Sequence, residues 1–218
     1  MSEVFIVGGA GNLGRRLCKS LVRQGHTARP MYRHSTQETE LLGNDIHPIQ
    51  GDLLHLSPEE LAQKMLGSDA VVFTAGAGDT DDPTMTQKID GDGLSKVISS
   101  AKIAGIERVI LVSAFPEASR DKPYSASRES YLHVKKMSEV ELSASDLDWV
   151  IVRAGILNDN PGIGKVRANQ AVPFGNVTRD DVAAFLAEIV PNTSISRTII
   201  EVTEGDELIN DAVGNLAK

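Results

Sequence analysis

The stretch VGGAGNLGRRLCKSLVRQG, Val7–Gly25, decides the fold of this chain. It places Gly8, Gly11 and Gly14 three residues apart, directly after the apolar run EVFIVG. An apolar stripe at helical spacing begins at about Asn12, so the stretch reads as a strand, a glycine loop and a helix. The question is whether this loop holds a dinucleotide or is only a turn.

The context favours a dinucleotide. The first glycine allows a tight turn, the second lets the backbone approach a pyrophosphate, and the third lets the helix pack on the sheet. The amides of the first helical turn, among them those of Asn12 and Leu13, would then point at the anion. We therefore predict a dinucleotide site, with a turn that binds nothing as the alternative.

Strand and helix patterns alternate along the rest of the chain. Short runs rich in Val and Ile predict strands at 3–8, 27–33, 46–51, 69–76, 107–114, 147–155 and 197–203. Amphipathic patterns predict helices at 13–25, 57–66, 86–104, 127–143 and 179–190. This alternation predicts an α/β fold, a doubly wound and mainly parallel Rossmann sheet flanked by helices, with a small C-terminal segment on the substrate side. We expect residues 1–218 to form a single NAD(P)-binding domain.

Composition narrows the classes of partner. Of the 218 residues, 41% are hydrophobic and 24% charged, which suits a packed core under an ordinary surface. A net charge of −8 and 4% aromatic residues argue against nucleic acid as a partner. No apolar run is long enough for a membrane span, and we expect a cytoplasmic protein that binds a small molecule. The oligomeric state stays open.

The single cysteine and an acidic stretch are predicted to have no catalytic or metal-binding role. The single cysteine, Cys18, falls within the first predicted helix, where we expect a small buried side chain and not a reactive thiol. Asp79, Asp81 and Asp82 lack a distal ligand, so we expect a solvated loop there and no metal site.

The end of the second strand indicates which dinucleotide binds. An NAD site usually has an acid there, to bond the ribose 2′-hydroxyl. This chain reads MYRHSTQ, with Arg33 and His34 and no acid before Glu38. Arg15 can join Arg33 around a 2′-phosphate, which predicts NADP(H). The alternative is that both arginines are solvated surface charges.

Two further stretches suit the adenine half of the cofactor. Asp52 and Leu53 follow the third strand in GDL. The small residues Ala75, Gly76, Ala77 and Gly78 follow the fourth strand and would let the backbone approach the cofactor.

At this point the chain resembles the atypical short-chain dehydrogenase/reductase family, and within it the single-domain group of biliverdin reductase B-like and NmrA-like proteins. The resemblance covers about 4–157 and rests on VGGAGNLGRRL, GDL, FTAGAG, AGIERVILVSA, YLHVKKMSEVELSASDLDWVIVRAGIL and their order. It implies NADP binding at the carboxyl edge of the sheet, with Gly155 and Ile156 near the nicotinamide. The chain departs from the family pattern at Val7, where threonine is common, and at Ala154, where proline is usual. No counterpart of the superfamily's helix asparagine is evident.

The resemblance also supplies a catalytic set. The superfamily's Ser and Tyr-x-x-x-Lys pattern falls on Ser113, Tyr131 and Lys135, the last two sharing one face of a predicted helix. Tyr131 would donate the proton, Ser113 would orient the carbonyl, and Lys135 would favour the phenolate and hold the nicotinamide ribose. The alternative is a chance match, since Tyr124 and Arg128 form a similar pair and some relatives use protons from water. We expect His133 to be a surface residue.

Three functions follow from these residues. The first is an NADPH-dependent reductase of a small carbonyl, quinone or flavin-like acceptor. The second is a non-catalytic NADP sensor of the NmrA-like type that acts through a protein partner. The third, a sugar-nucleotide epimerase or dehydratase, is disfavoured because only residues 156–218 follow Gly155. We expect those residues to form one helix, one strand and loops, with 158–185 as a lid over the pocket. The identity of the substrate is not readable from them.

Overall fold

The computed structural model describes residues 1–77, 83–118 and 123–217. The predicted acidic loop at Asp79, Asp81 and Asp82, and the predicted contact Gly78, lie outside these ranges.

The strands are β1 (Glu3–Val7), β2 (Thr27–Tyr32), β3 (Ile49–Gln50), β4 (Ala70–Phe73), β5 (Arg108–Ala114), β6 (Asp148–Ala154), β7 (Ile156–Asn158), β8 (Lys165–Asn169), β9 (Asn176–Thr178), β10 (Thr198–Glu204) and β11 (Glu207–Leu208). The helices are α1 (Asn12–Arg23), α2 (Pro58–Met65), α3 (Pro83–Thr86), α4 (Asp92–Ala104), α5 (Ala126–Ala144), α6 (Arg179–Ile189) and α7 (Ile209–Leu216), with a 3₁₀ helix at Ser35–Leu41 and a π-helical turn at Gln87–Gly91.

The central sheet confirms the predicted architecture. Its order is β11-β8-β10-β6-β5-β4-β1-β2-β3, and the segment from β3 to β6 is the Rossmann order 3-2-1-4-5-6. All pairs from β3 to β10 are parallel, and β8 pairs antiparallel with β10 and β11. A second, two-stranded sheet joins β7 and β9 in parallel.

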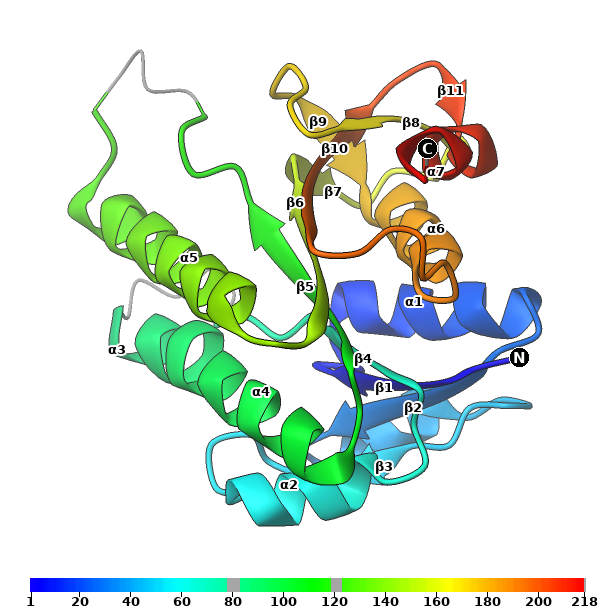
Figure 1. The fold of residues 1–218 in the computed structure, drawn as a ribbon, viewed down its shortest axis with the longest axis vertical. Coiled ribbons are helices and arrows are strands. Elements are labelled where there is room, and N and C mark those ends of the chain that lie inside the picture. Colours follow the sequence, from blue (N-terminus) through cyan, green and yellow to red (C-terminus); the bar gives the residue numbers. More distant parts are fainter. Residues whose placement is uncertain (78–82, 119–122, 218) are drawn as a thin grey trace.

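Both faces of the sheet are covered by helices, as the doubly apolar strands predict. Val4 and Ile6 of β1 pack in the core that includes α1, α6 and α7. Phe5 and Val7 point to the opposite face and pack in the core that includes α2, α4 and α5. Figure 1 shows these two helical layers on either side of the sheet.

Local signals for helix ends are confirmed. Ser57 caps α2 by accepting a 3.2 Å hydrogen bond from the Glu60 amide, and Pro58 opens the helix. Cys18 is 1% exposed in α1, and burial raises the pKa of its thiol to about 12. It is therefore a core side chain, as predicted.

The C-terminal part is more structured than the sequence predicts. The expectation of one helix, one strand and loops after Gly155 is wrong, because β7, β8, β9, β11 and α7 are also present. The strands are short, and β8, with the sequence KVRAN, has a single fully buried residue, Val166. Such strands are held by their neighbours and carry little hydrophobic pattern of their own. Elsewhere, the predicted strand 46–51 contracts to β3 plus a single bridge from Ile46 to Ala28.

No helix in the described ranges is long and apolar enough to cross a membrane. Within the same ranges, no group of three or more His, Cys, Asp or Glu side chains is arranged to hold a metal ion.

Arg108 ties the sheet to the end of α6. Its guanidinium donates to the carbonyl oxygens of Val190 at 2.8 Å and Ile189 at 2.9 Å, and to Asp148 Oδ2 at 2.6 Å. It also reaches the carbonyls of Asn192 and Ile195. Arg108 is 6% exposed, so one buried cation satisfies several carbonyls at the C-terminal end of α6.

Replacing Arg108 with Met should therefore destabilise the fold by about 3–5 kcal/mol, because Asp148 and the carbonyls lose their buried partner. Urea denaturation at neutral pH measures this loss. Lys102→Met is the control, since Lys102 forms an exposed pair with Asp146 and should change stability by about 1 kcal/mol or less. Equal effects of the two substitutions would contradict the role given to Arg108.

Candidate functional site

The predicted site residues follow strands that end at the same edge of the sheet. β1, β2, β4, β5 and β6 are parallel, so their carboxyl ends and the loops after them share that edge. The strand order reverses between β1 and β4, where loops from neighbouring strands diverge. Open α/β sheets bind ligands at such a switch point.

The glycine loop is packed too closely for side chains. Gly8 has φ +83°, and a Cβ atom there would lie 2.6 Å from the amide nitrogen of Ala75. A Cβ atom on Gly14 would lie 2.4 Å from the carbonyl oxygen of Gly8. Gly9, which the sequence reading did not single out, is equally tight, with a Cβ position 2.3 Å from Pro30 Cβ.

The N-terminus of α1 carries neither a cap nor an acid. Its N-cap residue is Gly11, without a side-chain hydrogen bond, and no acidic residue lies in the first turn. The N-termini of α2 and α6, in contrast, are capped by Ser57 and Thr178. The first-turn amides of α1 thus suit a bound anion such as a pyrophosphate. Asn12 and Leu13 stand in this turn, and the Leu13 side chain packs in the core.

The residues after β2 are organised by the 3₁₀ helix. Gln37 Oε1 accepts the amides of Arg33 at 3.0 Å and His34 at 2.9 Å. Arg33 Nε lies 2.9 Å from His34 Nε2. At the other end of the same helix, Glu40 forms an ion pair with Arg15. One short helix therefore contacts both arginines predicted to bind the 2′-phosphate.

Asp52 follows β3 beside this region. Its carboxylate accepts the Leu54 amide at 2.9 Å and lies 3.0 Å from His55 Nδ1. Partial burial raises the pKa of Asp52, but these hydrogen bonds and the charges of His55 and Arg33 outweigh it and lower the pKa. Asp52 is therefore an acceptor-only carboxylate at neutral pH. The neighbouring Leu53 is buried, and its carbonyl accepts Lys96 Nζ at 2.6 Å.

A buried ion pair joins the loop after β4 to α5. Asp90 lies in the π-helical turn and is 2% exposed, and its Oδ2 accepts the Ala77 amide at 3.0 Å. Its Oδ1 lies 3.3 Å from Nζ of Lys135, which also donates to the Val112 carbonyl at 2.8 Å. π-helical turns are frequent at functional sites. Through Asp90, this turn holds Lys135 close to the predicted cofactor contacts Gly76 and Ala77.

The other two residues of the predicted catalytic set lie on the elements that hold Lys135 and its acceptor: Ser113 on β5 and Tyr131 on α5. Ser113, the residue after Val112, is 5% exposed, and its Oγ has no hydrogen-bond partner in the part of the chain that the structure describes. Tyr131 lies one turn before Lys135 on α5 and is half-buried. The Arg128 guanidinium lies 5.3 Å from the centre of the Tyr131 ring. His133, predicted to be a surface residue, is exposed.

A second, partly buried charge cluster lies beside Ser113. Ser113, Arg153 and Glu201 are neighbours in register across β5, β6 and β10. Arg153 donates to Glu139 of α5 at 2.7 Å and lies 3.5 Å from Glu201. Hydrogen bonding to Glu139 and the charges of both carboxylates raise the pKa of Arg153, in spite of its partial burial.

The residues directly after β6 contact β10 and the loop before β9. Gly155 donates its amide to the Val202 carbonyl at 2.9 Å, and Ile156 donates to the Gly175 carbonyl at 2.9 Å. A Cβ atom on Gly155 would lie 2.2 Å from the Gly175 oxygen, so this close approach requires glycine. Ile156 is 54% exposed.

The segment 170–175 is held by contacts with Glu201 in the middle of β10 and with Phe115, the residue after β5. Glu201 accepts the Val172 amide at 3.0 Å, and the rings of Phe115 and Phe174 meet edge to face at 5.3 Å. These contacts place part of the predicted lid beside Ser113 and Gly155.

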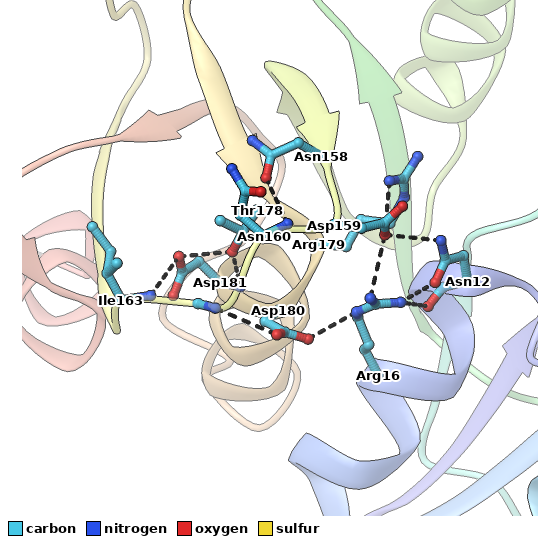
Figure 2. Close-up of polar contacts among 11 residues, drawn as sticks. Asn12, Arg16, Asn158, Asp159, Asn160, Ile163, Thr178, Arg179, Asp180 and Asp181 are labelled. Atoms are coloured by element: carbon cyan, nitrogen blue, oxygen red, sulfur yellow. Dashed lines mark hydrogen bonds and ion pairs between the residues drawn. The ribbon is translucent and has the colours of Figure 1, made fainter.

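Another part of the predicted lid 158–185 contacts α1, the helix after the glycine loop, as Figure 2 shows. Asp159 Oδ1 accepts Asn12 Nδ2 at 2.9 Å and contacts Arg16 at 3.2 Å and Arg179 at 3.0 Å. Arg16 also donates to Asp180 at 2.8 Å. The start of α1 and the C-terminal segment are thus joined by a network of exposed charges.

Several residues of this site were not predicted from the sequence. Asp90 carries a weak signal, an acid within an apolar helical pattern. Glu139, Arg153 and Glu201 are separated in sequence; the sheet register brings Arg153 beside Glu201, and the packing of α5 on the sheet adds Glu139. Glu40 lies beyond the end of β2, and only the 3₁₀ helix returns it to Arg15.

Gly14→Ala should impair both folding and cofactor binding, because the added methyl group would collide with Gly8 and force the loop away from α1. Overpacking of this kind costs about 1–3 kcal/mol. We expect a matching loss in urea-denaturation stability and weaker NADPH binding by calorimetry. Gly214→Ala is the control, since nothing lies within 4 Å of the added Cβ. Unchanged NADPH affinity in Gly14→Ala would contradict the close-packing argument.

Asp90→Ala should destabilise the fold by about 3–5 kcal/mol, because it leaves the buried Lys135 ammonium without its carboxylate. The double variant Asp90→Ala/Lys135→Met should regain part of this loss, since no buried charge then stands alone. Urea denaturation of the two variants gives the comparison. A double variant less stable than Asp90→Ala would show that the pair is not coupled in this way.

Comparison with known proteins agrees with this geometry. A protein of Bacillus subtilis (strain 168) named "Uncharacterized sugar epimerase YhfK" is 34% identical over 98% of this chain and 100% of its own length. The solved structure of a putative NAD-dependent epimerase/dehydratase from Bacillus halodurans has 32% identity and a TM-score of 0.88, over 99% of this chain and 100% of that chain. The oxidoreductase ylbE from Lactococcus lactis has 26% identity and a TM-score of 0.85, over 98% and 96%. A family model described as NAD(P)H-binding matches residues 8–193, and the chain belongs to this NAD(P)H-binding family.

Proposed function

We propose that the chain is an NADPH-dependent oxidoreductase that reduces a small carbonyl, quinone or flavin-like acceptor. The observation that carries this proposal is the Ser113 hydroxyl, which is buried and has no partner within the described residues. A buried hydroxyl without a hydrogen bond costs free energy in the unliganded fold. Its place at the carboxyl end of β5 supports a hydrogen bond to a ligand oxygen instead.

The residues around the loop fit the cofactor. Gly8 and Gly11 and the first-turn amides of α1 would hold the pyrophosphate, and Arg15 and Arg33 the 2′-phosphate. Two further groups complete this assignment: Asp52, Leu53, Ala75, Gly76 and Ala77 on the adenine half, and Gly155 and Ile156 near the nicotinamide. NADPH, when bound, supplies the hydride.

The proton then comes from the chain. In this assignment Tyr131 gives its phenolic proton to the acceptor oxygen that Ser113 orients by donating a hydrogen bond. The positive charge of Lys135 stabilises the phenolate that remains on Tyr131. Lys135 has three N–H donors, and contacts with Val112 and Asp90 engage two of them. The third has no acceptor among the described residues and would bond the nicotinamide ribose in this assignment.

An epimerase is the second candidate, and the names of two relatives favour it. The protein named sugar epimerase matches over its whole length, so a short C-terminal segment does not separate the two functions. The two reactions differ in their net consumption of cofactor. A reductase consumes one NADPH for each acceptor reduced, whereas an epimerase regenerates its cofactor and gives no net consumption.

Net oxidation of NADPH should therefore appear with at least one member of a panel of aldehydes, quinones, flavins and biliverdin. Tyr131→Phe should lower kcat by about a hundredfold or more, because a general acid typically contributes this much. Tyr124→Phe is the control, as it removes a nearby tyrosine hydroxyl that has no proposed role.

NADPH binding without net oxidation by any acceptor would overturn the reductase proposal and leave the epimerase and a sensor of the NmrA-like type as the candidates. Full activity in Tyr131→Phe would remove Tyr131 as the proton donor while leaving hydride transfer in place.

A further inference from the structure

The proposed preference for NADP rests on Arg15 and Arg33, and in the structure a carboxylate stands beside Arg15. Glu40 forms an ion pair with Arg15, with side-chain exposures of 55% and 37%. One of the two positive charges expected to receive the 2′-phosphate is therefore already paired with a negative charge.

A 2′-phosphate brings close to two negative charges at neutral pH. To contact Arg15 it must approach the Glu40 carboxylate, and like charges at such separations repel. A ribose that ends in a 2′-hydroxyl brings no charge and meets no such opposition. Glu40 therefore acts on one form of the dinucleotide and not on the other.

We propose that Glu40 is a specificity-determining residue that weakens the preference for NADP(H) over NAD(H) by competing with the 2′-phosphate for Arg15. This inference rests on the proposed assignment of Arg15 to the 2′-phosphate. The pair is exposed, so it contributes little to folding, and a change at Glu40 should appear in cofactor binding without a loss of stability.

The same 3₁₀ helix offers a matched control. Glu38 is also exposed and carries the same charge, but it hydrogen-bonds to Tyr32. Burial and this carboxylate together raise the pKa of Tyr32. Glu38→Gln removes one negative charge from the helix without freeing Arg15.

The test measures Kd by calorimetry for the full chain and for Glu40→Gln and Glu38→Gln. The four probes are NADPH, NADH, 2′,5′-ADP and 5′-AMP; the last two carry no nicotinamide, so their binding is independent of turnover. Glu40→Gln should tighten NADPH and 2′,5′-ADP about fivefold, the upper range for an exposed ion pair, and leave NADH and 5′-AMP unchanged. Glu38→Gln should change none of them.

Three results would overturn the inference. If Glu40→Gln leaves NADPH affinity unchanged or weakens it while the original chain binds NADPH, Glu40 does not compete with the phosphate. If Glu38→Gln tightens NADPH equally, the effect belongs to the net charge of the surface and not to the Arg15 pair. If the original chain binds neither NADPH nor NADH, the proposed function fails, and this inference fails with it.

Discussion

The close approach of Gly8 to Gly14 is the constraint on which the rest of this structure depends. With no side chain on either residue, the start of α1 lies directly against the loop that leaves β1, while Gly8 also touches the backbone after β4. This contact aims the uncapped amides of α1 at the switch point of the sheet. The other candidate groups are placed relative to that point by the strands, loops and helices that carry them.

A largely buried polar layer lies between the sheet and α5 at the candidate site. Asp90 and Lys135 form one ion pair, and Glu139, Arg153 and Glu201 form a neighbouring cluster, with Ser113 between them in the sheet. Each charge in this layer has a partner of opposite sign, whereas the Ser113 hydroxyl has no hydrogen-bond partner among the described residues. The same layer reaches the lid through Glu201 and Val172. The charge cluster and the segment 170–175 are therefore joined by a hydrogen bond and not by packing alone.

Local patterns predicted the fold well, because glycine spacing, strands apolar on both faces and the Ser57 cap act over a few residues. The sheet order follows from that alternation and the handedness of crossovers. The C-terminal strands were missed because β8 and β9 are defined by pairing and not by their own residues. Asp90, Arg153 and Glu40 were missed for a related reason, since their partners are distant in sequence. The catalytic assignments to Ser113, Tyr131 and Lys135 remain predictions that this geometry supports.

A crystal structure of the chain with NADP⁺ tests the central claim most directly, namely that this edge of the sheet is a redox cofactor site. The account predicts the pyrophosphate on the first-turn amides of α1 and the nicotinamide beside Ser113 and Gly155. A nicotinamide directed away from Ser113, or a dinucleotide bound at another face of the sheet, would contradict it.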